Sequence, residues 1–133
     1  MQLPIRALLY GIAIWFAWVS LLVAPAELLP AGIVGSALFV STQTVALATL
    51  ALGATILYLR KVGDSTFEEG FLVGLGWVVI MIAIDFAHSV VMPDMVPDVG
   101  SHFATVVPTY VVLPIITTLT MGYLERRTRK PKS

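Results

Sequence analysis

Asp85 and His88 are the residues of this 133-residue chain whose types and spacing point most directly to chemistry. Asp85 lies inside an apolar stretch, residues 70–92, which is long enough to form a membrane-spanning helix. A carboxylate at membrane depth is costly, so by default it is a functional-site hypothesis. His88 follows three residues later and would face the same side of a helix. One helical turn therefore offers both an acid and an imidazole.

A metal site is the first chemistry that this pair suggests. Asp85 and His88 have the i, i+3 spacing that carboxylate and histidine ligands use in helix-bundle metal sites. Such bundles normally supply several further carboxylates, and only Glu27 and the loop acids on the same side of the membrane are available here. Haem held by two histidines would require His88 and His102, with no further supporting feature. We expect no cofactor and leave metal binding by Asp85 and His88 open.

Enzymatic chemistry is disfavoured by what the sequence lacks. Hydrolysis inside a membrane by paired aspartates would need a second acid near Asp85, and hydrolysis by serine would need a base beside an activated hydroxyl. The sequence contains no such spacing, no phosphate-binding loop, no dinucleotide fingerprint and no nucleic-acid surface. It also contains no cysteine, which excludes disulfides and thiol catalysis. We assign no catalytic residue.

Composition determines the class of protein in which these residues must be positioned. The chain is 58% hydrophobic and 12% charged, and its mean hydropathy is +0.92. These values are typical of an integral membrane protein. Four apolar runs predict a single all-α domain, a four-helix bundle built as two helical hairpins. The expected spans are residues 4–24, 32–59, 70–92 and 103–124, followed by a basic tail at 125–133.

Residues 1–26 have an alternative interpretation as a secretory signal peptide. Ala24-Pro25-Ala26 has the small-x-small form of a cleavage site. However, the apolar run is long for the hydrophobic region of a signal peptide, and it contains Trp15 and Trp18. We therefore expect a first span that ends near Ala24, because prolines follow at once.

The distribution of charge predicts the topology. The formal net charge is zero, but the basic residues fall only at Arg6, at Arg60-Lys61 and in the tail. Four spans place all three of these segments on one side, which the positive-inside rule makes cytoplasmic. The N- and C-termini are then both inside, in the cytoplasmic membrane, with the tail contacting anionic lipid. The connections on the opposite side carry no Lys or Arg and contain Glu27, Asp94, Asp98 and His102, the last three interpreted as loop residues.

Polar side chains from all four helices are expected at one depth in the outer half of the membrane. Asp85 lies about seven residues from the outer end of its helix, or about 10 Å deep. Tyr110 lies at a similar depth, and Pro114 leaves the carbonyl of Tyr110 without its usual helical donor. Together these form a candidate binding pocket centred on Asp85. Its predicted lining residues are Trp18, Thr42, Gln43, Asp85, His88, Tyr110 and Pro114.

Helical spacing predicts which faces turn inward. Three- and four-residue steps align one stripe on each of three helices. Gly70 and Gly74 also form a small-xxx-small pair, for which we expect close packing within the bundle. The stripes are Leu8, Gly11, Trp15, Trp18 and Leu22; Gly70, Gly74, Trp77, Met81, Asp85 and His88; and Tyr110, Pro114, Thr117 and Met121.

Two classes of function remain open. One is a pocket that binds or transports a small solute or protons, since an acid, an imidazole and helix-breaking residues occur together. Four helices are few for a pathway within one chain, so this interpretation predicts a homo-oligomer. The other is a non-transporting structural or assembly subunit, whose polar side chains only hold the helices in register. Membrane lipids are the expected partners, and the small-molecule ligand is not specified.

Several motifs occur along the last two expected spans, namely Glu69-Gly70, Gly74, Trp77, Asp85, Tyr110, Pro114-Ile115-Ile116-Thr117 and Gly122-Tyr123. With these motifs the second half of the chain resembles a group of small uncharacterised four-span membrane proteins of prokaryotes. The resemblance implies the four-helix plan and brings no activity with it. The loop before the last span, which contains His102, departs from the short polar loop expected in that group.

Overall fold

The computed structural model describes residues 3–23, 28–34, 36–62, 66–93 and 98–128. Over these ranges the fold is all-helical, as predicted from the sequence, and no strand is formed. The signal-peptide cleavage site, Glu27 and Asp94 lie outside the described residues. The helices are α1 (Leu3–Trp18), the π-helix η1 (Val19–Val23), α3 (Ala31–Val34), α4 (Ala37–Val62), α5 (Phe67–Val91), α6 (Val99–Tyr110) and α7 (Val112–Thr128).

Three helices are long and apolar enough to cross a membrane. They cover Ala37–Arg60, Phe67–Val91 and Val99–Arg127, the last one formed by α6 and α7 together. The first expected span contains a shorter apolar helix, Ile5–Leu21, which continues as a π-helix to Val23. The structure therefore has four main helices, and three of them are by themselves long enough to span a membrane.

Capping side chains explain why three helices begin where they do. Thr66 accepts a hydrogen bond from the backbone N–H of Glu69, so α5 begins at Phe67 rather than at residue 70. Asp98 accepts one from Gly100, so α6 begins at Val99 rather than at 103. Ser36 accepts one from Phe39 at the start of α4, which separates the short α3 from the long helix predicted over 32–59.

The last apolar run is broken at one residue. α6 ends at Tyr110 and α7 begins at Val112, with a turn at Val111. Pro114 has no backbone N–H to donate to Tyr110, which accounts for a break at this point. The sequence predicts a single helix over residues 103–124 in which the Tyr110 carbonyl lacks its donor; the structure divides this helix at Val111, and α7 continues to Thr128 instead of ending at residue 124.

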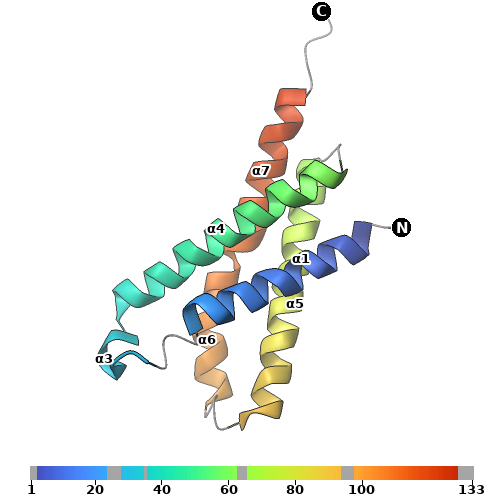
Figure 1. Ribbon diagram of the computed structural model, residues 1–133. Helices are drawn as coiled ribbons and strands as arrows, with labels where there is room; N and C mark the ends of the chain where they lie inside the picture. Colours follow the sequence, from blue (N-terminus) through green and yellow to red (C-terminus); the bar gives the residue numbers. More distant parts are fainter. Residues whose placement is uncertain (1–2, 24–27, 35, 63–65, 94–97, 129–133) are drawn as a thin grey trace, which may run out of the picture.

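The helices pack as a ring of neighbours. α5 packs most extensively on α7, α7 also contacts α4, and α1 contacts both α4 and α5. In Figure 1 α1 and α4 run obliquely across the pair formed by α5 and the α6–α7 helix. The chain therefore forms two hairpins, α1 with α4 and α5 with α6–α7, as predicted.

Two glycines allow the closest helix contact of the bundle. A Cβ atom on Gly74 would lie 2.2 Å from the Thr117 hydroxyl oxygen and 2.4 Å from Cα of Pro114. A Cβ atom on Gly70 would lie 2.8 Å from the Thr117 carbonyl oxygen. All three distances are shorter than real side chains tolerate, so α5 and α7 touch backbone to backbone. The expected packing of this pair inside the bundle is confirmed.

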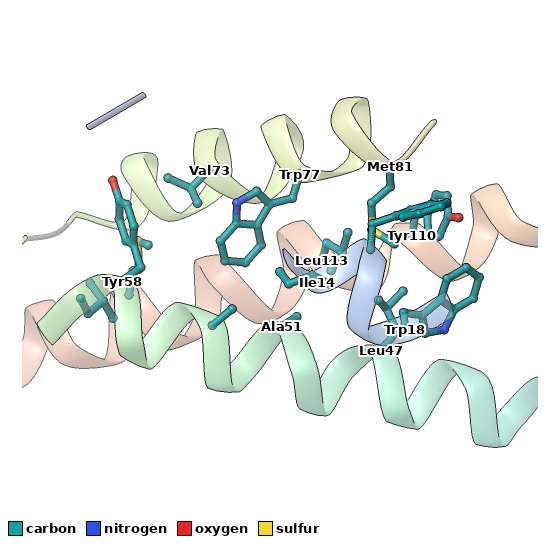
Figure 2. Packing of buried hydrophobic residues seen from close by; sticks show 14 residues of the cluster. Ile14, Trp18, Leu47, Ala51, Tyr58, Val73, Trp77, Met81, Tyr110 and Leu113 are labelled. Carbon is teal, nitrogen blue, oxygen red and sulfur yellow. The ribbon is translucent and has the colours of Figure 1, made fainter. Parts of the chain in front are cut away.

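The core runs the length of the bundle between the four helices. Figure 2 shows Tyr58 at one end, Trp77 near the middle, and Tyr110 beside Trp18 at the other end. The Trp77 indole also donates to the carbonyl of Ala7 at 2.7 Å, which ties α5 to α1. The fully buried hydrophobic side chains, with no exposed surface, are Leu47, Ala51, Trp77, Met81, Tyr110, Leu113 and Met121.

The predicted inward stripes are largely observed. On α5 all of the predicted stripe is buried except His88, which is partly exposed, and Ser89 is buried in its place. On α1 the side chain of Leu8 is exposed, and Ile14 takes its place in the core with Trp15 and Trp18. The side chain of Leu22 lies outside the described part.

Candidate functional site

Asp85 is buried and is held by two donors from different helices. Only 5% of the residue is exposed. The Trp15 indole N–H, from α1, donates to Oδ1 at 2.7 Å, and the Tyr110 hydroxyl, from the end of α6, donates to Oδ2. Each carboxylate oxygen therefore has its own donor. The expected convergence of Asp85 and Tyr110 is observed, and Trp15 is a partner that the sequence-based pocket did not include.

His102 completes what we call the Asp85 cluster, namely Trp15, Asp85, His102 and Tyr110. Its Nε2 atom lies 3.7 Å from Oδ2 of Asp85. The imidazole is 33% exposed, whereas the Asp85 side chain is 6% exposed. His102 lies on α6 and not in a loop as predicted, because Asp98 caps the helix four residues earlier. It is the cluster member that connects the carboxylate with the surface.

Trp18 supports the cluster from the side. Its ring packs edge-on against Tyr110, with centroids 5.7 Å apart, and only 3% of the residue is exposed. Its indole nitrogen makes no hydrogen bond within the described part of the chain. Trp18 was predicted to line the site, and it does so by packing against the phenol instead of bonding to the acid.

His88 is separated from the carboxylate although it is only three residues away. Its ring lies edge-on to Trp15, with centroids 6.2 Å apart, and the histidine that approaches Asp85 is His102. Among the described residues no three or more His, Asp or Glu side chains gather closely enough to hold a metal ion. The metal site suggested by Asp85 and His88 therefore has no third ligand within that part of the chain.

The polar residues of α4 do not join the cluster. The Thr42 hydroxyl is exposed and donates back to the carbonyl of Leu38 at 2.8 Å. Gln43 is partly buried, and no hydrogen bond connects it to Asp85 or Tyr110. Pro114 packs against Gly74 and acts on the site only through the helix break beside Tyr110. Of the seven predicted lining residues, the structure thus brings Asp85, Tyr110 and Trp18 together.

A second polar contact lies at the other end of α5. The Tyr58 hydroxyl, from α4, donates to Oε1 of Glu69 at 3.4 Å, and Arg6 interacts electrostatically with Tyr58. Nearby, the backbone N–H of Phe67 donates to Glu125 at 3.0 Å. The first turn of α1, the end of α4, the start of α5 and the end of α7 therefore meet, and we call this the N/C end. The Asp85 cluster lies toward the opposite end.

This arrangement can hold and exchange a proton. A carboxylate is an acceptor when ionised, and each of its oxygens has a donor. One surface hollow lies along α1 and another lies between α1 and α4, and neither is lined by a member of the cluster. Imidazole is the side chain best suited to move protons near neutral pH.

Comparisons of the chain with protein-family models, with curated proteins and with solved structures find no match. The resemblance to small four-span proteins therefore stays a prediction, and the geometry of the cluster is what indicates a function.

Proposed function

We propose that this chain is a multi-pass protein of the cytoplasmic membrane, with four spans and both termini inside. The three long apolar helices support insertion. The basic residues Arg6, Arg60 and Arg126 fall on helix segments that meet at the N/C end, as the positive-inside rule requires. On this topology the Asp85 cluster opens toward the outer side.

The absence of native cysteine allows a clean test of this topology. Ser101→Cys and Glu68→Cys place single thiols at exposed positions near opposite ends of the bundle. In intact cells, a membrane-impermeant maleimide is expected to label Ser101→Cys and to label Glu68→Cys only after lysis. Labelling of both in intact cells, or of Glu68→Cys alone, would refute the orientation.

We further propose that the Asp85 cluster is a proton-binding site of a small transport protein. The observation that supports this is a buried carboxylate within 3.7 Å of a partly exposed imidazole. Intramembrane acids of this kind mark ion pathways and proton relays in other membrane proteins. In this proposal protons reach Asp85 from outside through His102, while Trp15 and Tyr110 hold the carboxylate in place.

The middle of the bundle limits the movement of protons through a single chain. Between Asp85 and the N/C end lie Trp77, Met81 and Leu113, which have no exposed surface, and the buried hydroxyls of Thr55 and Thr117 donate to carbonyls of their own helices. Among the described residues, hydrogen bonds form no continuous chain from Asp85 to the N/C end. The proposal accordingly includes a homo-oligomer, in which neighbouring copies complete the pathway.

Proton flux in reconstituted vesicles tests the proposal. The wild-type protein is expected to dissipate an imposed pH gradient faster than empty liposomes, and Asp85→Asn is expected to abolish that difference. Glu68→Gln is the matched control, because Glu68 is an exposed acid on the same helix. If the wild type leaks no faster than empty liposomes, the transport proposal is wrong.

A structural or assembly role is the second candidate. It is favoured by the two hydrogen bonds that Asp85 accepts, one from α1 and one from α6. In that case the cluster would only fix helix register. The wild type would then show no proton flux above that of empty liposomes. Asp85→Asn would only lower the unfolding temperature.

A further inference from the structure

A surface groove runs along α1 and between α1 and α4. One hollow of about 320 Å³ is walled by small or apolar side chains of both helices. A second hollow, of about 400 Å³, continues along the same face of α1 and shares Tyr10 and Ala13 with the first. The residues that line the two hollows are Arg6, Leu9, Tyr10, Ala13, Ile14, Ala17, Thr49, Leu50, Gly53, Ala54 and Leu57.

The groove carries a charged side chain at one end only. Arg6 lines its end near the start of α1, at the N/C end of the bundle, and the remaining wall is apolar apart from Tyr10 and Thr49. Gly53 leaves the middle open, because a Cβ atom built on it would meet no atom within 4 Å. A cationic mouth leading into an apolar trough is complementary to a molecule with an anionic head and a hydrocarbon chain.

The length of the groove distinguishes a lipid chain from a protein helix. From Arg6 to Ala17 the lining residues of α1 extend over about 16 Å at the usual helical rise. The hydrocarbon core of a bilayer is about 30 Å thick, so the groove matches one leaflet. A spanning helix of a second copy would require a groove of the full thickness.

We propose that this groove binds one acyl chain of an anionic phospholipid from the cytoplasmic leaflet, with its phosphate beside Arg6. The inference rests on the membrane location proposed above, and it does not depend on proton binding at Asp85. A bound lipid would cover part of α4, which is the least buried of the three long helices.

Native mass spectrometry of the detergent-purified, delipidated protein tests this proposal. The probes are phosphatidylglycerol and phosphatidylcholine with identical acyl chains. We expect the wild type to bind phosphatidylglycerol more tightly. Arg6→Gln is expected to lower that preference by about five-fold, the effect of one basic residue near an anionic surface. The matched control Arg126→Gln, at the same end but outside the groove, is expected to leave it unchanged.

A second comparison measures lipid binding by a variant whose groove is filled by a larger side chain. Gly53→Leu is expected to weaken phosphatidylglycerol binding by roughly tenfold or more, because the added side chain occupies the trough. Gly76→Leu is its control, since Gly76 lies on α5 outside the groove and a Cβ atom there also meets nothing within 4 Å. Equal binding by these two variants, or equal affinity of the wild type for both lipids, would overturn the proposal.

Two further outcomes separate this proposal from its alternatives. If the wild type is a dimer and Gly53→Leu makes it a monomer, the groove is an interface between copies and the lipid proposal is wrong. Asp85→Asn is expected to bind phosphatidylglycerol like the wild type. A failure of lipid binding would therefore leave the proton proposal standing, and a failure of proton flux would leave the lipid proposal standing.

Discussion

Helix α5 carries two acids that each accept a hydrogen bond from a tyrosine of another helix, and the two sites differ in the number of their hydrogen bonds and in their burial. Glu69 lies in the first turn of α5 and receives one long bond, 3.4 Å, from Tyr58. Asp85 lies more than four turns further on and receives one bond to each oxygen, from Trp15 and Tyr110.

The two carboxylates differ in the groups that stabilise their negative charge. Glu69 is partly exposed and complements the N-terminal dipole of its helix, so water and backbone can stabilise its charge. Asp85 lies in mid-helix, where backbone groups bond to one another and only side chains from neighbouring helices remain. A bundle that needed only interhelical tyrosine bonds could place its acids at the helix ends. The more costly position of Asp85 is therefore what a functional account has to explain.

The largest change in the free energy of unfolding is expected when the two acids are removed in turn. Asp85→Ala leaves two buried donors without an acceptor and is expected to lower the free energy of unfolding by about 2–4 kcal/mol. Glu69→Ala is expected to lower it by less than about 1 kcal/mol, because water replaces the carboxylate. Denaturant titration in detergent micelles measures both values, and similar losses would remove the distinction between the two sites.

Removal of the hydrogen-bond donors tests the same difference between Asp85 and Glu69. Trp15→Phe and Tyr110→Phe are each expected to cost about 1 kcal/mol. Because they bond to the two oxygens of one carboxylate, the double variant should depart from additivity by about 0.5 kcal/mol or more. Tyr58→Phe, the control at the other acid, should cost less than either. Strict additivity would indicate that the donors do not act on one group.

A smaller effect on stability is expected for His102. Its imidazole is partly exposed and lies 3.7 Å from Asp85, so His102→Asn should change the free energy of unfolding by less than about 0.5 kcal/mol. If the cluster exchanges protons through this residue, the same variant should slow proton flux in vesicles. Flux at the wild-type rate would remove His102 from the pathway.

The smallest effect concerns the cap that positions His102. The hydroxyl of Ser101 bonds to Asp98 and, with help from backbone N–H groups, lowers the pKa of that carboxyl from its ordinary value of 3.8. A lowered pKa in the folded state means that the stabilisation is present above pH 3.8 and is lost as the pH falls through the lower value. Asp98→Asn should therefore show a weaker loss of stability in this acidic range, as measured by thermal unfolding at successive pH values.

The sequence predicted the pattern of helices and the inward face of α5 well. Gly70, Gly74, Trp77, Met81 and Asp85 recur at helical spacing, and all of them are buried. Spacing along one helix is a local property, so it can be read from the sequence before the partners are known. The proline break beside Tyr110 follows from the same kind of local rule.

The partners of Asp85 were harder to predict, because they depend on how each helix is rotated. Trp15 and Trp18 occupy neighbouring positions on one face of α1, and a small rotation decides which indole reaches the carboxylate. The sequence predicts a loop at His102, because Pro97, Asp98 and Gly100 suggest a turn. Recognising Asp98 as an N-cap would have placed His102 in the second turn of a helix. The exposure of Thr42 and the absence of Gln43 from the cluster follow from packing that no local pattern contains.

Infrared titration of the Asp85 carboxyl group tests the central proposal most directly. The difference spectrum between acidic and neutral pH should contain a protonated-carboxyl band that disappears in Asp85→Asn and is retained in the control Glu68→Gln. In His102→Asn the same band should appear more slowly after a pH jump. If no band depends on Asp85 at any pH at which the protein stays folded, the carboxylate is a fixed hydrogen-bond acceptor and the proton-binding account is wrong.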